Sequence, residues 1–463
     1  MYAYTNIIYD LFIILLLIGG ISQFRSPRSA RTGNMTAALA MLFAMALVLY
    51  RYPATHQSIV AAGLIVGAVF GIIVALRVTM IQIPSMVAFQ HGAGGVAAFI
   101  VAFVELTRES AELTTVGEIS GYLGLFIGAA TFSGSMLASG KLAGKLKQTP
   151  QVLPQHNTIL VLLVGIIAAL CVASRYTGAG IAPYIYSGVI LLSAVLGVVF
   201  SMRIGGADMP VLISFLNATA GLAAAFCGIV IQNRLLIACG ATVAASGSIL
   251  TAVMCRGMNR GIGNVFTGTG SAKGKATDAL AIPKEVPQLK LPKPQEAMSR
   301  ARTILGKAKK VIIIPGYGMA LAKAQFKVAD LAKILEKRGA EVKFAIHPVA
   351  GRMPGHMNVL LAEAEIDYDK LKEMDDVNSE FSSSDVVLVV GACDVVNPEA
   401  IKTEGTPISG MPILKAYEAK NVLVCNLDQR PGYSGVENTL YHDPKTVLLF
   451  GDAAKTISEL SAE

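Results

Sequence analysis

About the first 256 residues alternate long apolar runs with short polar connections. Each run is roughly 17 to 25 residues long, and a helix of that length crosses the hydrocarbon core of a bilayer. The centres of nine such runs lie near Leu15, Ala44, Val66, Ala97, Gly128, Gly165, Leu191, Ala220 and Ala245. The pattern predicts a polytopic α-helical membrane bundle with nine spans, which we assign to residues 1–258. Glycines at helical spacing, such as Gly63, Gly67 and Gly71, predict close approach of neighbouring helices.

Basic residues in the connections predict the orientation of this bundle. They follow the odd-numbered runs at Arg25, Arg28, Arg31, Arg77, Lys141, Lys145, Lys147, Arg203, Arg256 and Arg260. The connections after the even-numbered runs carry only Arg51, Arg108, Arg175 and Arg234. By the positive-inside rule, the N-terminus lies outside and the C-terminal third lies in the cytoplasm. Eight or ten spans would break this alternation.

The pattern changes beyond the last apolar run. Residues 259–300 are rich in Gly, Lys and Pro, which predicts an extended, solvated linker. From residue 301 to 463, short β-branched runs alternate with amphipathic helical stretches, which is typical of a doubly wound, Rossmann-like parallel sheet. The strand candidates are Val311–Ile314, Val342–Ile346, Val386–Val390, Val422–Val424 and Val447–Phe450.

Composition agrees with a membrane protein, because 53% of the residues are hydrophobic and only 15% are charged. A net charge of +8 can indicate nucleic-acid binding, but no RNA- or DNA-binding motif accompanies it. The six cysteines have no metal-ligand spacing, so we expect free thiols and no metal site.

Two segments of the C-terminal third carry candidate chemistry. The turn at Gly316, Tyr317 and Gly318 directly follows a strand and opens a helix, as in dinucleotide sites, although a plain tight turn explains it too. The loop from His347 to Asn358 follows the next strand and carries Arg352, which could hold a phosphate or could be a solvated surface arginine. This region shows no nucleophile–base pair of the kind used in covalent catalysis. A hydride transfer between two nicotinamide rings, one reaction of dinucleotide cofactors, does not require such a pair.

Long runs of this sequence resemble the β subunit of proton-translocating NAD(P) transhydrogenases. The similar runs are residues 205–210, 315–319, 347–363, 408–412 and 432–436. The resemblance implies hydride exchange between NAD(H) and NADP(H), coupled to proton movement into the cytoplasm. It implies an NADP(H) site formed by Gly316, Tyr317, Gly318, Val349, Ala350, Gly351, Arg352, Pro354, Gly391, Ala392, Asp394, Gly432, Tyr433, Gly451, Asp452 and Ala453.

The same resemblance implies partners and a location. It places the NAD(H) site on an α subunit, and this chain shows no second Gly-rich strand–helix turn that could form one. It further implies a dimer of αβ units in the inner or cytoplasmic membrane, with the nucleotide-binding domain in the cytoplasm.

Three polar residues of the membrane part are candidates for the proton pathway. His91 is the only histidine well inside an apolar run; it either serves protons or is a neutral histidine bonded to another helix. The resemblance assigns His91 to the proton pathway and Asn217 to a companion position. Asp208 either relays protons or docks the nucleotide domain, or it only caps a helix.

The sequence departs from the family after the strand that ends near Val424. The family has Lys-Arg-Ser there, which binds the 2′-phosphate of NADP(H), whereas this chain has Asn426, Leu427 and Asp428. An acidic residue there repels a phosphate, and Arg430 is the nearby cation that could replace the lost contact. We expect NADP(H) to remain the ligand, with a weaker preference over NAD(H). Two other functions stay open at this point, a transporter or channel with a nucleotide-sensing domain and a membrane-anchored dehydrogenase.

Overall fold

The computed structural model describes residues 2–23, 27–51, 57–108, 113–147, 150–178, 180–259, 261–267, 294–404 and 406–462. The chain divides into two compact units. One is helical and comprises Met1–Gly205 and Leu212–Thr251; the other comprises Gly206–Val211 and Ala252–Glu463 and contains a β-sheet.

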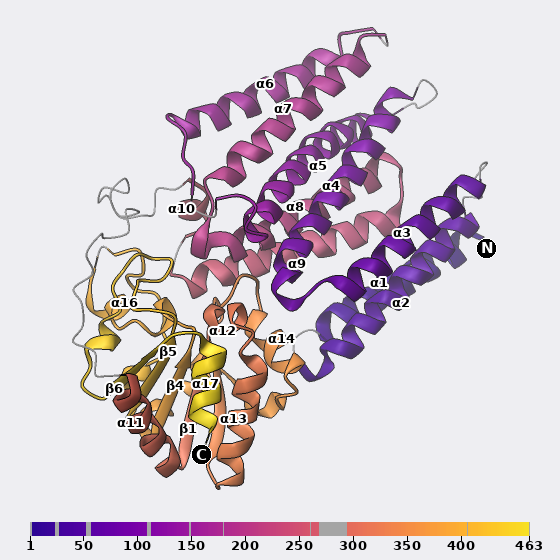
Figure 1. Ribbon diagram of the computed structural model, residues 1–463. Helices are drawn as coiled ribbons and strands as arrows, with labels where there is room; N and C mark the ends of the chain where they lie inside the picture. The colour runs from indigo at the N-terminus through magenta and orange to yellow at the C-terminus, as the bar shows by residue number, and fades with distance from the viewer. Residues whose placement is uncertain are drawn as a thin grey trace. The chain divides into compact units, whose positions relative to one another are not determined.

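All nine predicted apolar runs form helices (Figure 1). They are α1 (Tyr2–Ser22), α2 (Pro27–Arg51), α3 (Gln57–Arg77), α4 (Ile83–Thr107), α5 (Thr115–Leu142), α6 (His156–Ser174), α7 (Ala182–Met202), α8 (Met209–Val230) and α9 (Arg234–Gly257). Eight of them, α2 to α9, are long and apolar enough to cross a membrane. The apolar part of α1, Asn6–Ser22, is shorter, so length and composition support eight crossings among the described residues.

Glycines allow α4, α5 and α7 to pack closely. A Cβ added to Gly95 would lie 2.6 Å from the carbonyl oxygen of Gly128, and one added to Gly197 would overlap the carbonyl oxygen of Ala130. The expected close approach is therefore confirmed here. For α3 the expected close approach is wrong within this chain. No described atom lies within 4 Å of a Cβ built at Gly63, Gly67 or Gly71, and none of the described α3 residues is buried.

The second unit contains a six-stranded parallel sheet with the order β3-β2-β1-β4-β5-β6. Its strands are β1 (Lys310–Pro315), β2 (Glu341–Ile346), β3 (Leu371–Glu373), β4 (Val386–Val390), β5 (Val422–Asn426) and β6 (Thr446–Phe450). The five predicted strands are confirmed, and the short edge strand β3 was missed. Central strands such as β4 are apolar on both faces because both faces are buried.

Helices α11 (Pro294–Lys307), α13 (Gln325–Lys337) and α17 (Ala453–Ser461) cover one face of the sheet (Figure 1). The other face carries an apolar cluster that joins strand residues such as Ile314 and Val389 to Phe381 and Leu414. The shorter helices are α10 (Ile262–Thr267), α12 (Tyr317–Leu321), α14 (His356–Glu363), α15 (Met374–Val377) and α16 (Glu399–Lys402). Single 3₁₀ turns are η2 (Met80–Gln82), η3 (Gly206–Asp208), η4 (Tyr368–Lys370), η5 (Phe381–Ser383), η6 (Asp394–Val396), η7 (Ala416–Glu418) and η8 (Thr439–His442).

The extended linker expected over residues 259–300 is wrong at both of its described ends, because Ile262–Thr267 form α10 and the C-terminal end is helical as well. Residues 294–300 belong to α11, which packs on β6 and α17, and Ala297 is only 3% exposed. Proline at the first helical position is favourable because its missing N–H has no intrahelical partner there. Residues 268–293 of the predicted linker lie outside the described residues. Residues 294–300 therefore pack with the sheet, which the prediction had started at residue 301.

Candidate functional site

The residues expected to bind a nucleotide gather at one edge of the sheet. Gly316 follows β1, His347 follows β2, Gly391 follows β4, Leu427 follows β5 and Gly451 follows β6. Because all six strands are parallel, these positions share the carboxyl edge, where open α/β sheets bind ligands.

The first glycine-rich turn packs against the turn that follows β4. The backbone N–H of Gly318 donates to the carbonyl oxygen of Gly391 at 2.9 Å, and a Cβ at Gly318 would lie 2.7 Å from the Cα of Gly391. A Cβ at Gly316 would overlap the same backbone, and Gly391 has a φ of 69°. These glycines are therefore required by contact between two turns of the chain itself.

The helix expected after this turn is interrupted. Helix α12 has only five residues, and Lys323, which has a φ of 50°, lies between it and the start of α13 at Gln325. The prediction that the turn opens a helix is confirmed, and this helix is the short α12.

A cation and two aromatic rings meet at the carboxyl edge. The guanidinium carbon of Arg352 lies 4.2 Å from the centre of the Tyr317 ring, and Nη2 donates to the Tyr433 hydroxyl at 3.1 Å. Burial raises the pKa of Tyr317 to about 12, so this phenol is neutral at physiological pH. A guanidinium held on an aromatic face keeps its planar set of donors, which suits a phosphate.

Two imidazoles fix the loop that carries Arg352. The Val349 N–H donates to Nδ1 of His347 at 3.2 Å, and His347 Nε2 lies 2.8 Å from the carbonyl oxygen of Pro412. The Arg352 N–H donates to Nδ1 of His356 at 3.1 Å. Burial lowers the pKa of both histidines to about 4, and Arg352 contributes to the shift at His356. Both rings are therefore neutral, with Nδ1 as the acceptor. The predicted site residues Ala350, Gly351 and Pro354 lie in the same loop.

Asp394 joins the turn after β4 to the loop that carries Tyr433. Its carboxylate accepts from the Ser434 hydroxyl at 2.6 Å and from the Ser434 N–H at 3.1 Å. A Cβ at Gly432 would lie 2.7 Å from Oδ2 of Asp394. Burial raises the pKa of Asp394. Ala392, two residues earlier, is buried in the same turn.

The side chain of Asn426 does not lie open at this edge. It is 8% exposed, and its Nδ2 donates to the carbonyl oxygen of Ala392 at 2.8 Å and to the Tyr441 hydroxyl at 2.7 Å. As the last residue of β5, it shares the inward face with Val422 and Val424. The Asn426 side chain therefore links the end of β5 to the turn after β4 and to Tyr441.

Asp428 and Arg430 bind each other. One Asp428 oxygen accepts from the Arg430 backbone N–H at 2.9 Å, and the other lies 2.8 Å from Arg430 Nε. The side chain of Arg430 is 63% exposed. The cation expected to compensate for the missing Lys-Arg-Ser is thus held by the anion that replaced it.

Asp452 caps α17, because its side chain accepts from the Lys455 N–H at 3.0 Å. Gly451 has a φ of 143° and donates its N–H to the carbonyl oxygen of Asn426 at 2.9 Å. With Ala453, these residues place the N-terminus of a nine-residue helix at the carboxyl edge. Such a terminus favours anions.

In the helical unit, His91 lies on α4 and Asn217 on α8, whereas Asp208, in the turn before α8, belongs to the second unit. All three are half-buried. Helices α4 and α8 both pack on the middle of α5. A Cβ at Gly92 would lie 3.2 Å from the Ser135 Cβ, and the Thr131 hydroxyl donates to that of Thr219 at 2.9 Å. The structure therefore brings the helices of His91 and Asn217 to the same stretch of α5.

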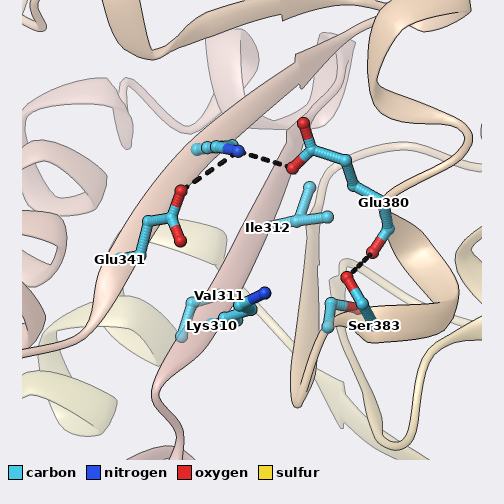
Figure 2. A pocket seen from close by; sticks show the side chains of 8 residues that line it. Lys310, Val311, Ile312, Glu341, Glu380 and Ser383 are labelled. Atoms are coloured by element: carbon cyan, nitrogen blue, oxygen red, sulfur yellow. Dashed lines mark hydrogen bonds and ion pairs between the residues drawn. The ribbon is translucent and has the colours of Figure 1, made fainter.

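A small hollow at the opposite, amino-terminal edge of the sheet is lined by residues that form an ion-pair cluster (Figure 2). Lys343 Nζ lies 2.6 Å from Glu380 Oε2 and 3.0 Å from Glu341 Oε1. The hydrogen bond to Glu380 raises the pKa of Lys343, and the hydrogen bond from Lys343 lowers the pKa of Glu341. Because these charges satisfy each other, the hollow is a structural feature.

Comparison with known proteins agrees with the geometry. Residues 6–463 match the family model of the NAD(P) transhydrogenase beta subunit. Two relatives from Rhodospirillum rubrum, each named NAD(P) transhydrogenase subunit beta, are 39% identical over 457 residues, which cover 97% of this chain and 96% of each relative. The chain belongs to the family of NAD(P) transhydrogenase beta subunits. It is therefore an enzyme subunit, and its long apolar helices make it a membrane protein.

Some buried polar residues of the helical unit were not among the site residues that the sequence predicted. Lys141 is only 2% exposed and donates to the carbonyl oxygens of Ser201, Met202 and Ile204 at 3.1, 2.8 and 2.7 Å. The buried hydroxyls of Ser135, Ser193 and Ser201 have no hydrogen-bond partner among the described residues. The sequence feature that could have identified them is a polar residue at the end or the centre of an apolar run. All six cysteines are free, as expected.

Proposed function

We propose that this chain binds NADP(H) at the carboxyl edge of its sheet and exchanges a hydride with NAD(H) held by an α subunit. The observation that carries the proposal is the cluster of Arg352, Tyr317 and Tyr433, three residues from separate segments that meet where a parallel sheet binds ligands. Membership of the transhydrogenase beta family supports the same assignment.

The residues present suit a dinucleotide phosphate. Arg352 supplies a cation with several parallel donors. When bound, the nicotinamide carries the hydride. The chain's task is to hold the ring in place, because placement is the main requirement for transfer between two nicotinamides. Tyr433 and the turn held by Asp394 are positioned for this task.

The sheet domain is proposed to be Rossmann-like, because its strand order matches that of dinucleotide-binding folds. We assign it to residues 294–463, with a linker before it and the membrane domain over residues 1–258. In this assignment α1 forms a ninth span, the N-terminus lies outside and the sheet domain lies in the cytoplasm. An assembly of two αβ units in the inner or cytoplasmic membrane completes the enzyme.

The helical unit is proposed to move one proton inward per hydride through His91, with Asn217 and the buried hydroxyls holding water beside it. Asp208, in the turn before α8, is the candidate for coupling this movement to the nucleotide domain. A proton that crosses about 200 mV releases roughly 4.6 kcal/mol, and each 1.4 kcal/mol changes an equilibrium tenfold. The coupling therefore shifts a balanced nucleotide exchange by about a thousandfold.

The test uses the complete αβ enzyme in sealed vesicles. Addition of NADPH and an NAD⁺ analogue is expected to produce the reduced analogue and a pH difference across the membrane together. Arg352→Gln should slow both, whereas Arg338→Gln, at the C-terminal end of α13, serves as a matched control and should slow neither. Nucleotide binding without hydride exchange in the complete enzyme would favour a transporter with a nucleotide-sensing domain instead.

A further inference from the structure

We infer that His356 is a positioning residue, which holds the backbone of Arg352 through its ring nitrogen Nδ1 and thereby sets where the guanidinium meets a phosphate. This inference rests on the proposed NADP(H) site and deepens it. The ring is buried, at 1% exposed, so it acts through Arg352 and does not touch the ligand.

The contact runs from the Arg352 N–H to Nδ1 of His356 at 3.1 Å. Two glycines with a positive φ, one just before each residue, shape the loop around this contact. Gly351 has a φ of 108° and Gly355 a φ of 70°, and a Cβ at Gly351 would lie 2.6 Å from the His356 Cβ. Both positions lie in the left-handed region that favours glycine. The loop therefore wraps around the imidazole, and only glycine fits next to the ring.

The tautomer of His356 follows from this contact. Since Nδ1 accepts a hydrogen bond, the ring proton of the neutral imidazole lies on Nε2. Nε2 is buried and has no partner among the described residues. A buried donor without a partner is costly, so a ring placed for packing alone would gain from turning or from replacement by an apolar side chain. The acceptor at Nδ1 gives a reason for the imidazole.

The side chain of Arg352 is held separately at its far end, by the Tyr317 ring and the Tyr433 hydroxyl. The Tyr317 ring also lies beside His356, with their centres 6.2 Å apart. The Tyr317 ring therefore contacts the Arg352 guanidinium and also lies beside His356, which binds the Arg352 backbone N–H. Loss of the Nδ1 contact frees the backbone of Arg352 and leaves the side chain supported at its far end alone, so the guanidinium is held less firmly relative to the carboxyl edge.

A matched pair of variants separates the two ring nitrogens. In His356→Asn the amide oxygen takes the place of Nδ1, whereas in His356→Gln it takes the place of Nε2. With the full-length chain in detergent, NADPH affinity is expected to stay within about twofold of wild type for Asn and to fall about tenfold for Gln, roughly the contribution of one hydrogen bond. Melting curves of both variants report the fold.

A double-mutant cycle tests whether the effect passes through Arg352. In an Arg352→Gln background, His356→Gln should change NADPH affinity no further, because the guanidinium that His356 positions is gone. Equal affinities of the Asn and Gln variants, additive losses in the cycle, or the loss of cooperative melting in both variants would each overturn the positioning role. Failure of the wild-type chain to bind NADPH would instead refute the proposed function itself.

Discussion

The ion pair between Asp428 and Arg430 predicts how strongly this enzyme prefers NADP(H). The pair holds the only cation that sequence reasoning offered to replace the lost Lys-Arg-Ser. We expect Asp428→Asn to tighten NADPH binding, since it removes an anion near the expected 2′-phosphate and releases the Arg430 guanidinium. The new amide still accepts from the Arg430 backbone N–H, so the turn is kept.

The magnitude follows from the exposure of the pair. With side chains 63% and 37% exposed, the Asp428–Arg430 contact contributes no more than about 1 kcal/mol, so little is lost on breaking it. A charge-assisted hydrogen bond to phosphate contributes about 1.5–3 kcal/mol, part of which solvent screening removes. A net gain of about 1 kcal/mol, roughly fivefold in NADPH affinity, is expected, with NADH affinity unchanged.

Titration of the full-length chain with NADPH and NADH by calorimetry measures the ratio of the two affinities. The gain should shrink at high salt, since exposed charges are screened. Asp330→Asn removes the same charge at an exposed position of α13 and serves as the control. An unchanged ratio in Asp428→Asn, or an equal change in the control, would show that Asp428 does not face the ribose.

The structure also limits how the family pattern can be restored. Replacing all three residues with Lys-Arg-Ser would put a lysine at Asn426, where the side chain is 8% exposed and bonded to Ala392 and Tyr441. A buried unpaired ammonium is strongly destabilising. Leu427, at 74% exposed, tolerates arginine, so Leu427→Arg with Asp428→Ser is the pair that should raise NADPH preference without unfolding the domain.

Three further outcomes are expected. His91→Ala in the complete enzyme should abolish proton uptake into vesicles and leave NADPH bound; normal pumping would remove His91 from the pathway. A fragment of residues 294–463 should melt cooperatively, and one of residues 301–463 should melt at a lower temperature or not fold, because it lacks the first half of α11 and buried Ala297. Hydrogen bonds from Lys420 and the backbone lower the pKa of Asp385 to about 2. The ionised Asp385 therefore stabilises the fold above its unfolded pKa, and this stabilisation is lost as the pH falls through about 2. The difference in melting temperature between wild type and Asp385→Asn should be full at about pH 7 and vanish near pH 2.

Hydrophobic patterning predicted most of the fold, and its failures have local causes. The missed strand β3 has three residues, Leu371, Lys372 and Glu373, without the β-branched run that marked the other five. It forms because it pairs with the carboxyl half of β2, a contact distant in sequence. The N-terminal part of α11 was assigned to the linker because Pro294 and its charged residues continue the composition of the preceding segment. Burial against β6 and α17 decides its structure instead.

The sequence predicted which residues gather at the candidate site, but it predicted less well where their side chains point. Residues at the ends of parallel strands necessarily share one edge, so the gathering of Gly316, Gly391 and Gly451 follows from topology alone. The direction of Asn426 depends on where β5 ends. With the strand ending near Val424, the asparagine belongs to a loop; with the strand extended to residue 426, its alternation points the side chain inward. The pairing of Asp428 with Arg430 is a turn contact that strand and helix periodicities do not describe.

Lys141 shows how a buried cation bears on the orientation of the membrane domain. Sequence reasoning counted it among the loop cations, but it lies in the last turn of α5 and its ammonium is bonded to three carbonyl oxygens at the end of α7. Such a cation cannot interact with lipid head groups in the folded protein. In the proposed orientation, the positive-inside rule acts while the chain inserts, before α7 is in place, so Lys141 is expected to count with Lys145 and Lys147 among the cations that favour a cytoplasmic connection. The same side chain thus favours one orientation during insertion and then caps the C-terminus of α7, where a positive charge opposes the helix dipole.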